Sequence, residues 1–563
     1  MRYIPPHTMH LKYRCLAFAK RAILIALVGL VLSVQGSFGR DIYILPDRLW
    51  AISGDTIWFL LSSSPFNMQN GNVAHVQLET FEHQSVTRAM LLIDQGMGKG
   101  YLVVPDALET GGYWLKAYQK SGDDAAMRSV SARLINVYHR FGEIYSVPES
   151  PAFAPSNHSP SAATLKLDLE ADTVKRREEL TIKVNIPSET AKTIRHLTLS
   201  GGYEDPAGHP ENNFFLLREK KNSDATLPPE NNGFYIEGRV TSAAALPEKI
   251  LVLLTVPGKE PHFDYYLTTN NGYFRFKLSK TYGTAGLLLR VISPEAGEFG
   301  IELLTPTENT ALRPSTDDTP APREFVGQLK SMREAAQFAR IFAGEQVPQE
   351  PYFRMEPIYP YPFYGQPDRR VIPAEFIELP NFMEISRELL TAVRFRQRAG
   401  GYQLQVLDQL ERKFFNQSPL RLVNGIPVFD DDLLFRFRSS DIAYIDLINH
   451  ERIFGDLSFK GVVAIVLNSD DRSWLSEEKN LFQFTVPALQ PAMVQSVYRS
   501  EVSQPSALPD FRRALLFEEI TVEQGVQEFT FNVSDLKGNV VIRLEGVTHN
   551  NEPFSIYRKI TVE

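Results

Sequence analysis

Two short segments of the sequence have residue types that could bind phosphate or a metal ion. Gly96–Gly100 has the glycines and the lysine of a phosphate loop, but such a loop follows a strand and opens a helix. The residues after it alternate as in a strand, which favours a hairpin turn. Asp430-Asp431-Asp432 offers oxygen ligands for Ca²⁺, but consecutive carboxylates point in different directions, which favours a solvated loop or a helix cap.

The side chains that most often carry catalysis show no recognisable spacing. The eleven histidines lack His-x-x-x-His spacing, and no serine stands in Gly-x-Ser-x-Gly. The single cysteine, Cys15, lies near the N-terminus, so the chain after it has no disulfide and no thiol nucleophile. We therefore expect no enzymatic activity, no cofactor and no bound metal. An enzyme stays an alternative, because catalytic triads need not be local in sequence.

Charge bears on the kind of partner. The chain has a net charge of −8, and residues 1–39 carry five basic and no acidic side chains, which leaves −13 on the remainder. An acidic chain is a poor partner for nucleic acid, which needs a basic footprint. Arg394, Arg396 and Arg398 alternate along one strand face and could contact an acidic partner or a glycan, although a solvated or salt-bridged face is the favoured interpretation.

Residues 1–39 have the pattern of a secretory signal peptide. Basic residues between Lys12 and Arg21 precede the apolar run Ala22–Val34, and small residues follow it. That run has 13 residues, whereas a membrane-spanning helix needs about 20 and a signal core about 7–15. We expect cleavage near Gly36 or Gly39 and export to the periplasm or outer membrane, with an uncleaved anchor as the alternative.

Residues 41–142 alternate in short strands separated by Gly, Asp and Asn turns, which predicts a β-sandwich. Three segments carry a more specific pattern. Asp47–Phe59 reads as a strand, a Gly-Asp hairpin and an aromatic strand; Lys99–Pro105 follows, and Gly111–Tyr118 is the closing Gly-Tyr strand. This text resembles the second macroglobulin-like domain of bacterial α2-macroglobulin relatives.

Two further sandwiches are expected before the middle of the chain. A linker rich in proline and serine leads into residues 160–230, whose strands alternate apolar and polar positions. Residues 232–305 resemble a β-sandwich of the carboxypeptidase-regulatory type, with a tight Asn271-Gly272 hairpin followed by Phe-x-Phe.

Residues 306–373 are expected to form a linker. Arg323–Phe342 has helical spacing of its apolar residues, whereas the prolines from Glu350 to Pro380 exclude a helix and favour an extended aromatic-rich segment. Gly344-Glu345-Gln346 resembles the macroglobulin thioester, but Ala343 occupies the position of the required cysteine, so acyl-trap chemistry is excluded.

Residues 374–470 resemble the plug domain of TonB-dependent outer-membrane receptors. The similarity begins with a strand and sharp turn in Pro419–Val428, continues with an expected helix over Asp441–Ile448, and ends with the apolar strand Gly461–Leu467. A short helix is also expected over Phe382–Val393. The resemblance implies a small mixed sheet with a helix, and structural turn residues at Asn424, Gly425, Pro427, Gly455 and Gly461.

The end of the chain predicts a last β-sandwich over residues 485–563. A receptor barrel of about 22 strands needs about 9–11 residues in each strand. Only 96 residues follow Leu467, so we expect a plug-like domain without a barrel of its own. The order of segments resembles a set of Bacteroidetes envelope proteins that join macroglobulin-like domains to a plug-like domain.

The expected fold class is mainly β, a multi-domain chain of macroglobulin-like or immunoglobulin-like sandwiches with a small α+β plug-like domain near the C-terminus. The expected role is non-enzymatic binding or scaffolding at the outer membrane, with other envelope proteins as partners. One alternative is an accessory of TonB-dependent uptake whose plug-like domain docks a separate barrel protein. The other is an envelope enzyme.

Overall fold

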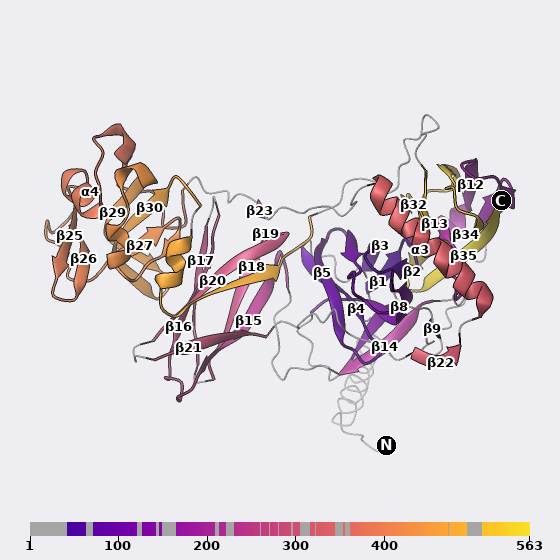
Figure 1. Ribbon diagram of the computed structural model, residues 1–563, viewed down its shortest axis with the longest axis horizontal. Coiled ribbons are helices and arrows are strands. Elements are labelled where there is room, and N and C mark those ends of the chain that lie inside the picture. Colours follow the sequence, from indigo (N-terminus) through magenta and orange to yellow (C-terminus); the bar gives the residue numbers. More distant parts are fainter. Residues whose placement is uncertain are drawn as a thin grey trace, which may run out of the picture.

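The fold consists of four mainly β units that lie in a row (Figure 1). This confirms the expected fold class of a mainly β chain with several sandwiches. The computed structural model describes residues 42–63, 71–120, 127–141, 146–148, 165–208, 213–220, 230–258, 261–269, 271–279, 281–293, 297–304, 316–320, 322–343, 353–354, 361–470, 472–491 and 509–563. The expected signal peptide and Gly344-Glu345-Gln346 lie outside these ranges.

The first sandwich, residues 42–138 and 213–220, pairs a sheet of order β1-β3-β6 with one of order β14-β8-β7-β4-β5, to which β2 adds by pairing with β8. Nearly every residue of β3 is buried, because its apolar run packs on both faces. The strands are β1 (Ile42–Pro46), β2 (Trp50–Ile52), β3 (Thr56–Ser63), β4 (Asn72–Glu79), β5 (Ser85–Ile93), β6 (Met97–Val103), β7 (Gly111–Tyr118), β8 (Met127–Tyr138) and β14 (Phe215–Lys220).

The glycine-rich segment of the first sandwich forms the expected hairpin. Gln95 and Gly96 have φ of 49° and 81°, and Asp94 and Met97 exchange backbone hydrogen bonds of 2.8 and 2.9 Å. Positive φ at both central positions is what a two-residue hairpin requires. Because β6 follows the turn directly, no helix begins there and the phosphate-loop interpretation is wrong.

The second sandwich joins two segments that the sequence assigned to separate domains. Residues 165–203 pair with residues 514–562 in sheets of order β10-β12-β33 and β11-β35-β34-β13-β32. The expected division into 160–230 and 485–563 is therefore wrong, because β13 is an inner strand flanked on both sides by C-terminal strands. The elements are β10 (Lys166–Leu169), β11 (Thr173–Val174), β12 (Glu179–Ile186), α2 (Ser188–Ala191), β13 (Ile194–Tyr203), β32 (Ala514–Ile520), β33 (Gly525–Asn532), β34 (Gly538–Thr548) and β35 (Pro553–Val562).

The third sandwich, residues 233–303 and 481–487, has sheets of order β18-β15-β21 and β17-β16-β20-β31. Its last strand comes from beyond the end unit, in a stretch that the sequence divided between an interdomain segment and the C-terminal sandwich. The strands are β15 (Gly233–Ser242), β16 (Leu251–Val256), β17 (His262–Leu267), β18 (Tyr273–Ser279), β19 (Thr281–Tyr282), β20 (Thr284–Ile292), β21 (Phe299–Leu303) and β31 (Leu481–Pro487).

The end unit, residues 361–478, contains a five-stranded mixed sheet of order β24-β29-β30-β27-β28 and a β25-β26 hairpin. In the sheet, β27 is parallel to β30 and β29 is antiparallel to it. The elements are β24 (Arg369–Val371), η2 (Pro373–Glu375), α4 (Phe382–Glu388), β25 (Val393–Arg398), β26 (Gly401–Val406), β27 (Leu420–Val423), β28 (Ile426–Pro427), α5 (Asp432–Phe435), η3 (Ser439–Asp441), β29 (Ile442–Phe454), β30 (Leu457–Leu467) and η4 (Ser473–Glu477).

The helix expected over Asp441–Ile448 is wrong. Those residues begin the long strand β29, and the helical turn of this region is α5 instead. Apolar residues at 442, 445 and 448 fit helical spacing, but a register shift puts Ile442 and Ile445 on one face of β29, and Ile448 is buried on the other face. The helix expected over Phe382–Val393 is present as α4 but ends earlier, at Glu388.

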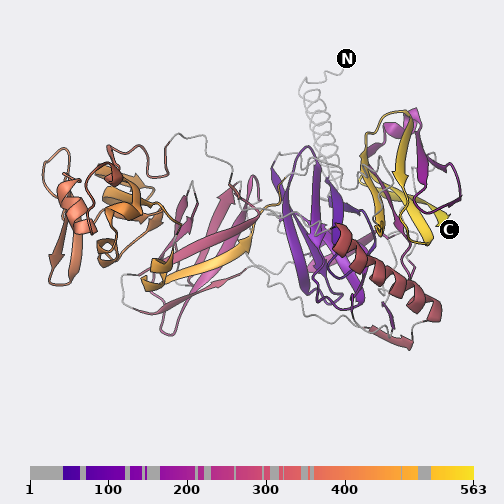
Figure 2. The same ribbon diagram turned by 45° about the horizontal axis from the view of Figure 1, so that its top comes forward.

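The units follow an order in space that differs from the order in sequence. Both views show the end unit at one extremity, then the third, the first and the second sandwich (Figures 1 and 2). The chain runs out to the end unit and returns, so β31 and β32–β35 complete sandwiches begun earlier. The predicted helix of the linker is α3 (Arg323–Ala343), and its apolar residues join the core of the second sandwich.

Three short strands connect these units. Two of them pair with each other, and the third forms a two-stranded sheet with β19: β9 (Ser146–Pro148), β22 (Thr316–Pro320) and β23 (Phe353–Arg354). Among the described residues, none of the helices combines the length and the hydropathy that crossing a bilayer requires.

Candidate binding sites

The turn residues singled out in the plug-like region are structural. Asn424 and Gly425 have φ of 49° and 78° and close the hairpin between β27 and β28. The Asn424 side chain accepts a hydrogen bond of 2.7 Å from the Leu467 N–H and donates one of 3.1 Å to the Ser469 carbonyl. These bonds tie the turn to the end of β30, so the asparagine orders the backbone.

Two of these turns contact the third sandwich. A Cβ on Gly425 would lie 2.4 Å from Pro261 Cγ, and one on Gly455 would lie 2.1 Å from Tyr265 Oη. The Asp456 N–H donates a hydrogen bond of 2.8 Å to that same phenol oxygen. Both glycines therefore allow a close approach between backbone and neighbouring unit, in addition to their positive φ.

The other two turn residues also have structural surroundings. Gly461 lies at the irregularity between β29 and β30, and a Cβ there would be 2.8 Å from the Ile448 carbonyl oxygen. The Pro427 carbonyl accepts a long hydrogen bond of 3.5 Å from Arg290 of the third sandwich. The backbone of the plug-like region is thus shaped around its neighbours, and no ligand is needed to explain these residues.

An aromatic cluster completes the junction between the third sandwich and the end unit. Phe263 of β17 lies 5.2 Å from Phe363 and 5.9 Å from Phe454, measured between ring centroids. Nearby, Arg290 and Glu478 form an ion pair of 2.6 Å whose side chains are only 7% and 2% exposed. Apolar rings and a buried, hydrogen-bonded charge pair together resist movement of one unit against the other.

The three alternating arginines lie on the β25-β26 hairpin, which Figure 1 shows at the outer extremity of the end unit. Arg394 packs over the Phe414 ring at 3.6 Å, whereas Arg396 and Arg398 are exposed. Phe395 points to the opposite face and is buried. Within the described part of the chain no ion pair involves Arg396 or Arg398, so the solvated interpretation fits this pair.

The three consecutive aspartates tie the start of α5 to β26. Asp432 accepts a hydrogen bond of 2.5 Å from the Tyr402 N–H, and Asp431 accepts one of 2.9 Å from the Leu404 N–H. Asp431 also pairs with Arg421 at 3.2 Å. Within the ranges that the structure covers, no cluster of three or more His, Cys, Asp or Glu residues has an arrangement that could hold a metal ion.

A serine and a histidine meet at the junction of the first and second sandwiches. Ser62 Oγ lies 2.8 Å from His196 Nδ1, but the Arg195 guanidinium also donates to this oxygen, at 3.3 and 3.2 Å. Ser62 is fully buried in β3, and neither cavity described below includes it. Burial and the Arg195 charge lower the pKa of His196 to about 4. A nucleophile needs room for substrate, so we interpret this contact as an interdomain hydrogen bond.

Sequence reasoning missed a group of deeply buried charges at the same junction. Arg133 of β8 pairs with Glu545 of β34 at 2.6 Å, with side chains 0% and 2% exposed. Asp205 accepts hydrogen bonds of 2.5 Å from Tyr138 and 2.8 Å from Asn136. The partners are far apart in sequence, so no local spacing could reveal them.

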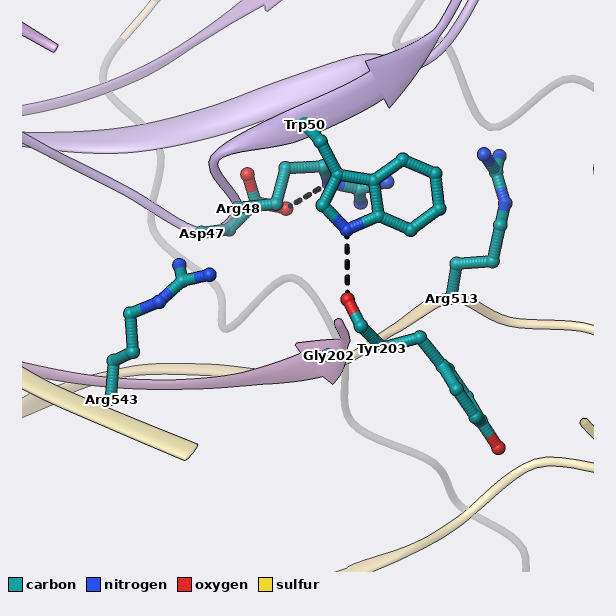
Figure 3. A pocket seen from close by; sticks show the side chains of 7 residues that line it. All are labelled: Asp47, Arg48, Trp50, Gly202, Tyr203, Arg513 and Arg543. Carbon is teal, nitrogen blue, oxygen red and sulfur yellow. Dashed lines mark hydrogen bonds and ion pairs between the residues drawn. The ribbon is translucent and has the colours of Figure 1, made fainter. Parts of the chain in front are cut away.

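A small cavity of about 10 Å³ lies between the first and second sandwiches (Figure 3). The Trp50 Nε1–H donates a hydrogen bond of 2.8 Å to the Tyr203 carbonyl, and Arg48 pairs with Asp47 at 2.9 Å. Arg513, lining the same cavity, pairs with Asp55 at 2.5 Å. Arg543 extends from β34 toward Asp47, and no dashed line reaches it in Figure 3.

A larger cavity of about 60 Å³ adjoins at Arg543, which lines both. Burial lowers the pKa of Arg543, and the Glu545 carboxylate opposes that effect. The wall consists of Leu49, Glu204, Asp205, Asn213, Val541, Arg543, Glu545, Ser555, Tyr557 and Lys559. Of these residues, Leu49 lies in the segment Asp47–Phe59 that predicted the first sandwich, and the pattern of that segment did not indicate a cavity.

No protein-family model matches the chain, and no curated protein matches its sequence. A crystal structure of a Salmonella alpha-2-macroglobulin mutant is 9% identical, with a TM-score of 0.21, covering 93% of this chain and 39% of that one. The trypsin-activated alpha-2-macroglobulin from Escherichia coli is 8% identical, with a TM-score of 0.21, covering 93% and 42%. The Yersinia pseudotuberculosis adhesin InvE is 12% identical, with a TM-score of 0.12, covering 46% and 57%.

The chain spans about two fifths of the length of the alpha-2-macroglobulin structures that it matches. At these TM-scores the likeness carries no argument about activity or partners. The description of this protein as a row of β-sandwiches rests on its own strand pairing.

Proposed function

We propose that this protein is a non-enzymatic binding or scaffold component of a bacterial envelope, acting at the outer membrane. The signal-like N-terminus and the resemblance to macroglobulin-like and plug-like domains support the compartment. The mainly β architecture, with its interlocked sandwiches, supports a mechanical role. Binding of a partner protein, without turnover, is the activity that this combination favours.

The observation that carries the proposal is the position of the end unit. It lies at one extremity of the row and is fixed to the third sandwich by the Phe263 cluster and the Arg290–Glu478 pair (Figure 2). Its outer hairpin exposes Arg396 and Arg398. A rigid support that holds an exposed charged hairpin away from its other end is suited to contacting a partner.

Site-specific photo-crosslinking in the producing cell tests this role. A crosslinking residue replaces Gln397, exposed on β25, and a matched one replaces Lys166, exposed on β10, which pairs with β12 in the second sandwich at the opposite end of the row. We expect an adduct with an envelope protein from position 397 and none from position 166. No adduct from position 397, equal adducts from both positions, or recovery of the intact chain in the cytosol would contradict the proposal.

A second candidate is an accessory of TonB-dependent uptake that docks a separate barrel protein. The parallel pairing of β27 with β30 in a mixed sheet favours it, because the plug resemblance implies such a sheet. The adduct from position 397 distinguishes the candidates. A partner whose migration on a denaturing gel changes with heating, as that of a folded barrel does, supports the accessory role, and any other partner supports the scaffold.

A further inference from the structure

One cation, Arg543, lines the larger cavity between the first and second sandwiches. Arg543 forms no hydrogen bond or ion pair with any described residue, although the carboxylates of Asp47, Asp205 and Glu545 all raise its pKa against the effect of burial. A guanidinium carries five N–H donors, and the partly buried Arg543 lines the cavity with donors available to a ligand or to water. An acceptor supplied by a ligand would satisfy them.

The other charges around the cavity have partners. Glu545 pairs with Arg133, and Glu204 accepts from Lys559 and from Asn539. Asp205 accepts from Tyr138 and Asn136. These contacts leave Arg543 as the side chain of this wall with the most unused hydrogen-bonding capacity.

The charges that line the cavity limit what the acceptor can be. Three carboxylates, those of Glu204, Asp205 and Glu545, face two cations, Arg543 and Lys559. Glu204 is paired with Lys559 and Glu545 with Arg133, so a simple anion bound to Arg543 would be repelled chiefly by the Asp205 carboxylate. A ligand that carries a positive group beside its carboxylate would satisfy Arg543 without that cost.

The volume and the lining of this cavity further limit which ligand could bind. A space of about 60 Å³ exceeds the volume that a single water molecule needs, roughly 10–15 Å³ on the same measure. Apolar atoms of Leu49 and Val541 line part of it, beside the hydroxyl of Ser555. The space therefore suits a compact molecule with charged groups of both signs and a short apolar part.

We propose that this cavity binds a small zwitterionic amino acid. Its carboxylate would accept hydrogen bonds from the planar guanidinium of Arg543, which matches a carboxylate in shape. Its ammonium group would face the carboxylates of Glu204, Asp205 and Glu545, and its short side chain would contact Leu49 and Val541. The ligand would bridge the two sandwiches, since Leu49 belongs to the first and Arg543 to the second. This inference does not depend on the proposed function.

Calorimetric titration of the full chain with L-alanine tests the site. We expect saturable binding to the unaltered protein and to the control Arg558→Gln, which removes an exposed arginine from neighbouring β35. Arg543→Gln should bind about tenfold more weakly or not at all, because it loses a charge-assisted hydrogen bond. Equal binding by Arg543→Gln and the unaltered protein, or no binding by the unaltered protein, would overturn the proposal.

Of two further experiments, one tests whether the ligand must carry both charges, and the other tests the cavity with a variant that keeps Arg543. Acetate and methylammonium each carry one of the two charges, so each should bind about tenfold more weakly than alanine. Acetate binding as tightly as alanine would overturn the zwitterionic assignment. Ser555→Leu fills the cavity and leaves every charge in place, so it should abolish alanine binding even if Arg543→Gln does not fold; retained binding would place the alanine elsewhere.

Discussion

The two main junctions of this molecule differ in the side-chain contacts that form them. The first and second sandwiches share apolar clusters and, in addition, meet through buried charges and hydrogen bonds, including Arg133–Glu545 and Trp50–Tyr203, with two cavities beside them. The third sandwich and the end unit meet mainly through phenylalanine rings, with one buried ion pair. A polar junction depends on each partner being present, whereas an aromatic junction depends on shape and area.

This difference has a consequence for where a ligand could act. At the first junction a guanidinium lines a cavity and has no acceptor among the described residues. The second junction instead holds a unit in a fixed position. The molecule thus has one junction that could bind a ligand and one that holds the end unit in a fixed position.

Breaking the buried ion pair should have the largest effect. Arg133→Met leaves the Glu545 carboxylate buried without its cation, which should cost about 3–5 kcal/mol of unfolding free energy. Urea unfolding followed by tryptophan fluorescence measures it, since Trp50, Trp58 and Trp114 all lie in the first sandwich.

The double variant Arg133→Met/Glu545→Met is the control for that experiment. Because it removes both charges, it should recover most of the lost stability. A double variant as unstable as the single one would show that packing, and not the unpaired charge, sets the cost.

Acidification should weaken the polar junction next. Burial, with the Arg195 charge, lowers the pKa of His196 to about 4, below its unfolded value of 6.5. The unfolded chain therefore binds the extra proton first, so this stabilisation is complete above pH 6.5 and is lost as the pH falls toward 4. The loss is on the order of 3 kcal/mol.

The measurement is the unfolding free energy between pH 7 and pH 4.5, compared with that of His196→Gln. Other carboxylates titrate in both proteins, so only the difference reports on His196. If the two curves run parallel, His196 is not responsible for the acid sensitivity.

A substitution at the aromatic junction should have a smaller effect. Gly425→Ala places a Cβ at positive φ and against Pro261, which should cost about 1–2 kcal/mol for the backbone alone. Trp474 fluorescence during urea unfolding follows the end unit, which contains this residue. The matched control is Gly286→Ala in β20, where an added Cβ meets no atom within 4 Å. Equal losses in the two variants would argue against a specific contact at Pro261.

The exposed hairpin should contribute least to stability. Arg396→Glu/Arg398→Glu should shift the thermal midpoint by no more than about 2 °C, because exposed residues without partners add little to folding. The same variant should lose the adduct from position 397 if the hairpin is the contact. A large fall in the midpoint would show that the two arginines have a structural role instead.

Much of the local structure followed from the sequence. Strands in the first sandwich, the hairpin at Gly96, the Asn424-Gly425 turn and helix α3 were all predictable, because turn residues and apolar spacing act over a few residues. The error at Asp441–Ile448 arises because a bulged strand that is buried on both faces imitates helical spacing over a short stretch.

The candidate site was not predictable in the same way. The cavity gathers Leu49, Asp205 and Arg543 from strands and loops on two sandwiches, and no motif indicated that they form a site. Their chemistry depends on which strands pair across the chain. The pairing of β13 with both β32 and β34 brings those distant segments together.

The amino-acid sequence by itself determined the strand-rich character, the sharp turns and the helix α3, since these depend on neighbours along the chain. Only the tertiary structure decided that residues 165–203 and 514–562 form one sandwich and that β31 returns to the third. Backbone hydrogen bonds between strands are the same for any pair of extended segments. The choice of partner is made by the burial of side chains over the whole unit, which no short stretch of sequence contains.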